Sequence, residues 1–487
     1  MVSSAAIALS IVAAFLAAAI GLALYGVRNV RMDRQEYIVG GRSFGTVFLW
    51  VLMAGEIYTS FTFLGAAGWA YGLGAPAYYI LAYGACAYVL GYFLLPAIWR
   101  VGKERSLLTS PDFFADRYGS SALGVAAGLI QFVALVPYVT LQLSGLQLLL
   151  RIAGYDTFDA TVAVGAAFLL IAFFVLTAGL RGTAWASVVK DVLVLGAVAF
   201  ASVAIPIHFF GSWSATIDQV LRTHPHVLTL AAGSAAHGTI WYVSTVVLTS
   251  LGFFTSPQGM SSAYSARSEQ ALRRNAMLLP FYQVALLLMF FAGLAALLIV
   301  PGLKGSAVDQ SFLLVVQRYY PPWIMGFVAA AGSLAALIPA SALLLAAASI
   351  FSKNVLGPFG IATGDRARLL ATRVLVVAVA LLALWFWLAE QKTLVELILI
   401  YYSAITQFVP GVCAAFLWRR ATAWGVFAGI AGGVGVAIVL TIRGVSPWGL
   451  NAGFAALCVN LALLLAVSLM TPARTPERAA SSAAAVN

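Results

Sequence analysis

A single carboxylate stands in the middle of a long apolar stretch, residues 49–74, and it is the side chain there best suited to chemistry. A charge at membrane depth costs roughly 2.5–3.5 kcal/mol on insertion scales, so Glu56 is expected to face a partner or a wet cavity. Small and hydroxyl residues surround it, namely Gly55, Tyr58, Thr59, Ser60, Thr62, Gly65 and Gly68. A helix that opens midway and turns its backbone toward a ligand needs such residues. The alternative is an unbroken bundle helix that holds one protonated Glu56.

A second pair of charges, Lys190 and Asp191, lies in another apolar stretch, residues 183–209. The long side chain of Lys190 could extend its ammonium group to the membrane surface. Alternatively, the ammonium stays inside the bundle, where burial lets a lysine trade a proton. Glu56 could exchange a proton for the same reason, so the sequence offers two titratable groups at membrane depth.

Composition places the whole chain in a bilayer. Of the 487 residues, 62% are hydrophobic and only 9% are charged, and the mean hydropathy is +0.98. Long apolar runs indicate an all-α integral membrane protein rather than a soluble domain or a barrel. The net charge of +11 then reflects loop orientation and not nucleic-acid binding. The three cysteines lie in apolar runs, so no disulfide framework is expected.

Hydropathy predicts thirteen membrane spans, at residues 5–27, 44–72, 75–99, 122–150, 159–180, 183–209, 238–258, 276–301, 322–352, 370–389, 394–418, 422–442 and 449–470. If the N-terminus lies outside, 20 of the 27 Lys and Arg residues fall in cytoplasmic segments, 6 fall in external loops, and Lys190 lies within a span. The positive-inside rule therefore predicts an external N-terminus and a cytoplasmic C-terminus in the plasma (inner) membrane. No cytoplasmic segment is long enough for a nucleotide-binding domain and no P-loop pattern occurs, which argues against an ATP-driven pump.

Four segments resemble the sodium/solute symporter family, whose fold is of the LeuT type. They are YIVGGRSFG at 37–45, TAGLRGTAWASVVKDVLVL at 177–195, SPQGMSSAYSARSEQALRRNA at 256–276 and ITQFVPGVCAAFLW at 405–418. They occur in the family's order over nearly the whole chain. These segments are most similar in sequence to the monocarboxylate-permease and pantothenate-permease branches of the family.

The resemblance implies a core of two inverted five-helix repeats, at residues 44–209 and 238–418. Residues 1–30 would add one helix before the core, residues 422–470 two helices after it, and residues 471–487 a disordered cytoplasmic tail. Core helices 1 and 6 carry glycine or proline at corresponding places, as at Gly252 and Pro257 in the sixth. Such a pair of interrupted spans is the best sequence pointer to a transporter's binding site.

The resemblance also implies a sodium site between core helices 1 and 8. An ungapped alignment of core helix 1 makes Gly55 and Tyr58 the carbonyl donors, and an alignment that keeps the alanine makes them Ala54 and Ile57. Both alignments remain open. On core helix 8 the carbonyl position falls on Ala335.

The two hydroxyls that the family supplies from core helix 8 fall on Ile338 and Pro339, which carry none. Sodium requires several oxygen ligands, so a sodium site that lacks these two hydroxyls is expected to be degenerate. A shifted alignment could substitute Ser341 or Ser333. With Na⁺ binding weakened, the ammonium group of Lys190 could occupy the ion's place.

Substrate contacts are expected from three core helices, at Thr59, Ser60 and Thr62 on the first, Tyr138 and Gln142 on the third, and Tyr402 and Gln407 on the tenth. Tyr138 and Gln142 are four residues apart and therefore share one helical face. Aromatic residues in a bundle are more often packed core than ligands, which is the competing interpretation for each tyrosine.

The function that these patterns favour is cation-coupled symport of a small organic solute, a monocarboxylate, by alternating access. Glu56 and Lys190 are the expected coupling groups, with H⁺ or Na⁺-independent coupling favoured over Na⁺. The expected partners are the solute, the coupling cation and the bilayer, with no cofactor other than Na⁺, no nucleic acid, and a monomer as the functional unit. The alternative is a transport-like membrane sensor subunit, and an enzyme is disfavoured because no catalytic cluster appears.

Overall fold

The computed structural model describes residues 3–30, 34–157, 159–361, 364–389 and 392–472, and the regular elements in this part of the chain are all helices. Its first half contains α1 (Ser4–Val27), α2 (Arg34–Val39), α3 (Thr46–Gly55), α4 (Ala66–Leu73), α5 (Tyr79–Glu104), α6 (Ser110–Tyr118), α7 (Ser121–Ala153), α8 (Ala160–Phe210) and α9 (Trp213–Thr223). Its second half contains α10 (Thr239–Thr255), α11 (Pro257–Ser265), α12 (Glu269–Val284), α13 (Leu286–Ile299), α14 (Ser311–Tyr319), α15 (Pro322–Ile350), α16 (Asp365–Ala389), α17 (Leu394–Ile405), α18 (Val409–Leu417), α19 (Ala423–Arg443) and α20 (Ala452–Met470). The predicted tail at 471–487 lies almost entirely outside the described residues.

The predicted count of thirteen spans is not confirmed as thirteen continuous helices. Among the described residues, eleven helices are long and apolar enough to cross a membrane, or twelve if the bent pair α10–α11 counts as one span. The remaining predicted span, 44–72, is divided between α3, which ends at Gly55, and α4, which begins at Ala66. Helix α3 has 10 residues and α4 has 8, so neither crosses a membrane alone and this span is absent from the eleven continuous helices.

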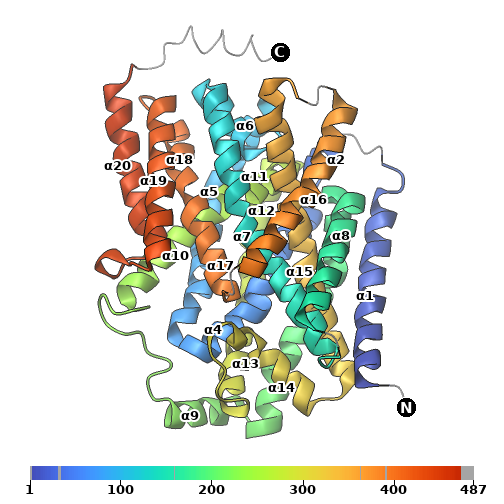
Figure 1. Cartoon of the computed structure of the whole chain (residues 1–487). Coiled ribbons are helices and arrows are strands. Elements are labelled where there is room, and N and C mark those ends of the chain that lie inside the picture. The colour runs from blue at the N-terminus through green and yellow to red at the C-terminus, as the bar shows by residue number, and fades with distance from the viewer. Residues whose placement is uncertain (1–2, 31–33, 158, 362–363, 390–391, 473–487) are drawn as a thin grey trace.

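The helices form a bundle in which most run between its two ends (Figure 1). Helix α15 lies at the centre, with 94% of its apolar window buried, and packs against α7, α8 and α1. Helices α19 and α20 pack mainly on each other at the opposite edge from α1 (Figure 1). Helix α1 begins at the end of the bundle that carries α9, and α20 ends at the end that carries α6 (Figure 1).

Helix α8 runs through two predicted spans because a glycine lets the chain turn between them. Gly179 has φ 55°, a left-handed conformation that a side chain would disfavour. The helix resumes directly and carries Lys190 and Asp191 toward α3 and α12. This kink therefore sets the direction from which the second charged pair enters the bundle.

The α6 end of the bundle is closed by contacts between the starts and ends of the interrupted spans. Phe44, before α3, pairs as an isolated parallel bridge with Ala266, after α11. Trp99 donates its indole N–H to the same Ala266 carbonyl over 2.7 Å. Arg42 donates to the carbonyl of Leu107. These bonds hold both interrupted spans to α5 and α6 at one end.

The α9 end is closed by a buried aspartate from the short helix η4 (Gly305–Gln310). Asp309 accepts a hydrogen bond over 2.8 Å from the backbone N–H of Leu394, the first residue of α17. A Cβ at Gly68 on α4 would lie 2.7 Å from the Asp309 carboxylate, so a glycine is needed for this approach. Trp69 reaches Thr393 over 3.4 Å beside it.

Candidate functional site

The first interruption lies between α3 and α4, and the chain there satisfies its own backbone. The hydroxyl of Thr62 donates to the carbonyl of Ile57 over 2.7 Å and accepts the N–H of Thr59 over 2.9 Å. The wide helical turn η2 (Phe61–Gly65) then leads into α4. One threonine therefore holds the loop that carries Glu56.

The second interruption lies between α10 and α11, where the axis bends by 45°. Ser256 is extended, with ψ 152°, because the following Pro257 disfavours helical geometry in the residue before it. Ser256 then caps the new helix, since its hydroxyl accepts the N–H of Gly259 over 3.2 Å. A proline at the first helical position costs nothing, because its missing N–H would be unpaired there.

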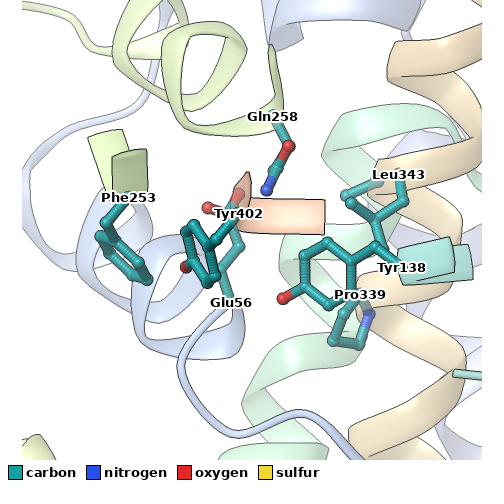
Figure 2. Close-up of a pocket in the computed structure, with 8 residues that line it drawn as sticks. Glu56, Tyr138, Phe253, Gln258, Pro339, Leu343 and Tyr402 are labelled. Atoms are coloured by element: carbon teal, nitrogen blue, oxygen red, sulfur yellow. The ribbon is translucent and has the colours of Figure 1, made fainter. Parts of the chain in front are cut away.

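A cavity lies between the two interruptions and the helices α7, α15 and α17 (Figure 2). Its lining consists of Glu56, Tyr138, Phe253, Gln258, Pro339, Ala342, Leu343 and Tyr402. About 10 Å³ is open to the centre of a water-sized sphere, which is room for about one water molecule. The structure is therefore closed around this site, and a larger solute requires the helices to move apart.

Glu56 contributes the one charged side chain to the cavity wall as the structure describes it. The hydroxyl of Ser262, on α11, donates to Glu56 Oε1 over 2.5 Å and so joins the two interrupted spans. Figure 2 shows Tyr402 beside Glu56 and the hydroxyl of Tyr138 directed toward them. This is a polar centre enclosed by aromatic and aliphatic walls, the usual form of a small-molecule site.

Lys190 approaches the same interruption from the opposite side and is fully buried, so it does not extend to the membrane surface. Its ammonium group donates to the carbonyl of Gly55 over 3.0 Å and to that of Tyr58 over 3.4 Å. It also pairs with Asp191 Oδ1 over 3.0 Å. A Cβ at position 55 would lie 3.0 Å from the hydroxyl of Ser187 and 3.4 Å from the ammonium nitrogen, so the glycine lets α8 pack closely against the interruption.

These two carbonyls are the pair that the ungapped alignment assigned to the ion. The carbonyls of the alternative pair are bonded within the chain. Ala54 O accepts the N–H of Ile57 over 3.0 Å, and Ile57 O accepts the Thr62 hydroxyl. The geometry thus favours Gly55 and Tyr58 as the cation-facing pair, although the ion ligands themselves remain a prediction.

On the α15 side of this region, the degenerate sodium site stays a prediction. Ile338 and Pro339 stand on a buried face with no side-chain oxygen, and Ser341 donates over 2.6 Å to the carbonyl of Ile338. Ser341 also pairs with Thr183 of α8 over 3.0 Å. Pro339 has no N–H, so the carbonyl of Ala335, four residues earlier, lacks its helical donor.

The structure brings two of the seven predicted substrate contacts, Tyr138 and Tyr402, into the cavity wall. Thr59 and Thr62 instead bond backbone groups of the interruption. Gln142 accepts the N–H of Ser60 over 3.3 Å and so also holds this loop. These three act on the shape of the site rather than lining its open space.

Gln407 lies away from the cavity, against the last two helices. Its side-chain amide donates to the carbonyl of Gly453 over 3.1 Å. Asn460 of α20 donates to the side-chain oxygen of Gln407 over 3.1 Å and to its backbone carbonyl over 2.6 Å. The sequence analysis missed Phe253, Gln258 and Ser262 as site residues. Pro257 could have indicated them, because residues that flank a helix break lie beside the space that the break opens.

Comparison with known proteins agrees with this architecture. Residues 37–433 match the model of the Sodium:solute symporter family. The symporter YhjB of Bacillus subtilis is 39% identical over 98% of this chain and 99% of its own length. A monocarboxylate transport permease protein of Rhizobium johnstonii is 27% identical over 91% of this chain and 92% of its own length. A substrate-bound, outward-open Na⁺-coupled sialic acid symporter superposes with a TM-score of 0.78 at 16% identity, covering 96% of this chain and 98% of that one.

The chain therefore belongs to the sodium:solute symporter family and has the LeuT-type fold. It is a multi-pass membrane transporter that couples a solute to a cation, and it is not an enzyme.

Proposed function

We propose that this symporter carries a small monocarboxylate by alternating access and that its transport does not require sodium. The ammonium group of Lys190 takes the place of the coupling ion, and protons drive the cycle. The observation that carries this proposal is the position of Lys190 Nζ, 3.0 Å from Gly55 O and 3.4 Å from Tyr58 O. A Na⁺ ion at these carbonyls would collide with the ammonium group or be repelled by it.

The charge balance around Lys190 supports a proton as the coupling ion. Asp191 neutralises the ammonium group and accepts a further hydrogen bond over 2.9 Å from Tyr282 of α12. The second oxygen of Asp191 is buried without a partner. A buried carboxylate with an unused oxygen beside a lysine can receive the lysine's proton, which would leave both groups neutral and weaken the hold on the two carbonyls. Coupling then requires that this proton be released to water on one side of the membrane and replaced from the other.

The proposed cargo rests on the relative from Rhizobium johnstonii, which is named for monocarboxylate transport. We further propose that the repeats span residues 44–209 and 238–418 in the plasma membrane, and that the monomer is the functional unit.

Uptake of labelled pyruvate, lactate and propionate into proteoliposomes tests the proposal. With choline replacing sodium, an inward proton gradient should drive accumulation, because one proton moving down 100 mV provides about 2.3 kcal/mol. Lys190→Ala should lose accumulation, whereas the exposed control Lys304→Ala should keep it. Strict dependence on a sodium gradient with no response to pH would refute the proposed coupling.

A further inference from the structure

The interruption of the first core span leaves its backbone N–H groups without capacity for a ligand. Each of the six N–H groups from 56 to 61 has an acceptor within the protein, in the order Met53 O, Ala54 O, Ala54 O, Thr62 Oγ1, Gln142 Oε1 and Thr59 Oγ1. Open N–H groups at a helix start are the usual receptor for an anion. Here that receptor is already filled, by the chain's own backbone carbonyls for residues 56–58 and by side chains for residues 59–61.

The second interruption is nearly as fully occupied. Pro257 has no N–H, Gly259 donates to the Ser256 hydroxyl over 3.2 Å, and Met260 donates to the Ser256 carbonyl over 2.9 Å. Gln258 accepts a hydrogen bond over 3.0 Å from Tyr401 and keeps its amide N–H₂ for the cavity, and Figure 2 shows this amide directed into it. The donors that remain for a solute are therefore neutral side chains.

The charges around the cavity leave Glu56 without a cation of its own. On α8, Lys190 acts on Glu56 from across the interruption but is paired with Asp191. The titratable groups that face Glu56 from other helices are phenols, Tyr138 on α7 and Tyr401 and Tyr402 on α17. From α11 it meets the neutral hydroxyl of Ser262.

A carboxylate solute beside an ionised Glu56 would place two like charges in a closed, weakly polar site. Two carboxylates that share a site cannot both stay ionised at little cost, and one proton held between them removes the repulsion. Ser262 already donates to Glu56 Oε1, so the proton belongs on the other oxygen, from which it can be donated to the solute. No covalent bond changes in this step, and the proton comes from the medium.

We propose that Glu56 receives the solute's carboxylate in its neutral form, so that each solute anion binds together with one proton. This rests on the proposed function, since it assumes that the cargo is a monocarboxylate. It assigns to Glu56 the roles of substrate receptor and proton carrier, while Lys190 governs the separate cation position. The site therefore selects solutes that accept a hydrogen bond from a carboxyl group and discriminates against amines while Glu56 is neutral.

Equilibrium binding to the purified full-length protein, without any gradient, tests this assignment. The probes are propionate, propionamide and propylamine, which match in size and differ in charge, measured from pH 5 to pH 8. The Kd of wild type for propionate should rise about tenfold per pH unit once Glu56 begins to ionise. Glu56→Gln, which keeps a donor but cannot titrate, should bind propionate with little pH dependence and within about tenfold of wild type at pH 5.

The exposed Glu104→Gln is the matched control and should keep the wild-type slope. Glu56→Asp retains a carboxyl group and should keep the dependence of the propionate Kd on pH at lower affinity. This variant tests the role of the carboxyl group if Glu56→Gln fails to fold. A wild-type affinity for propionate that is independent of pH overturns the inference, as does a Glu56→Gln variant with the wild-type slope. Propylamine binding at pH 5 that is as tight as propionate binding overturns it too, because Glu56 would then already be an ionised receptor for cations at that pH.

The failure of this inference is distinguishable from failure of the proposed function. Sodium-independent, proton-driven uptake of monocarboxylates with pH-independent binding contradicts the role of Glu56 alone. Absence of monocarboxylate uptake and binding at every pH contradicts the proposed cargo, and the role of Glu56 with it.

Discussion

At the scale of single residues, the site depends on side chains that repair the backbone where a helix is broken. Thr62 serves two backbone groups of the interruption, and Gln142 serves a third from another helix. An unpaired buried polar group costs about 1–3 kcal/mol. The interruption can therefore persist in the middle of a membrane span only because these partners are present.

This makes Thr62 a sensitive position for stability. Thr62→Val keeps the shape but removes the hydroxyl, leaving Thr59 N–H and Ile57 O unpaired, so the free energy of unfolding should fall by about 1–3 kcal/mol. A lower melting temperature of the detergent-purified protein is the measurement. Thr62→Ser retains the hydroxyl and should stay near wild type. Equal melting temperatures for the valine and serine variants would contradict the capping role.

At the scale of elements, short helices at each end of the bundle close the path to the cavity. At the α9 end, η4 inserts Asp309 between α4 and the first turn of α17. The carboxylate lies at a helix N-terminus, where a negative charge is favourable, but it is only 3% exposed and one oxygen has no partner. Two opposed effects thus act on its ionisation.

Burial wins, and it raises the pKa of Asp309 to about 7, while the Leu394 N–H lowers it and Glu396 raises it. The folded protein then holds a proton that the unfolded chain releases from about pH 3.8 upward. The resulting stability is fully present below that pH and is lost as pH rises through 7. The melting temperature of wild type should fall over this window. Asp309→Asn should flatten this fall in melting temperature, whereas the exposed control Asp218→Asn should not. If the melting temperature of Asp309→Asn depends on pH as that of wild type does, Asp309 is not the cause of the dependence.

At the scale of the whole molecule, α1 begins at one end of the bundle and α20, the last described helix, ends at the other (Figure 1). The loop charges, 20 against 6 Lys and Arg, predict that the α9 end faces outward and the α6 end faces the cytoplasm. The α9 segment would then lie on the external surface. Closure of both ends around a small cavity is the arrangement that alternating access requires between its two open states.

Orientation can be measured by labelling intact cells with an impermeant thiol reagent. After replacement of Cys86, Cys413 and Cys458, a cysteine at Ser3 should react from outside. A cysteine at Ala480, which lies outside the described residues, should react only after the membrane is opened. Reaction of both positions from the same side would refute the predicted topology.

The amino-acid sequence by itself determined the class of this protein. Three local features of the sequence carried this prediction: apolar runs long enough for a bilayer, an isolated Glu56 among glycines and hydroxyls, and a proline at 257. Each of them affects the structure of the segment in which it lies. They sufficed to predict the all-helical membrane fold, the family and the two interrupted spans. Only the tertiary structure decided which carbonyls face Lys190, because that contact joins residues 135 positions apart. The same holds for Gln407, whose side chain faces α20 and not the cavity, since the rotation of a helix about its axis is set by the neighbours that pack on it.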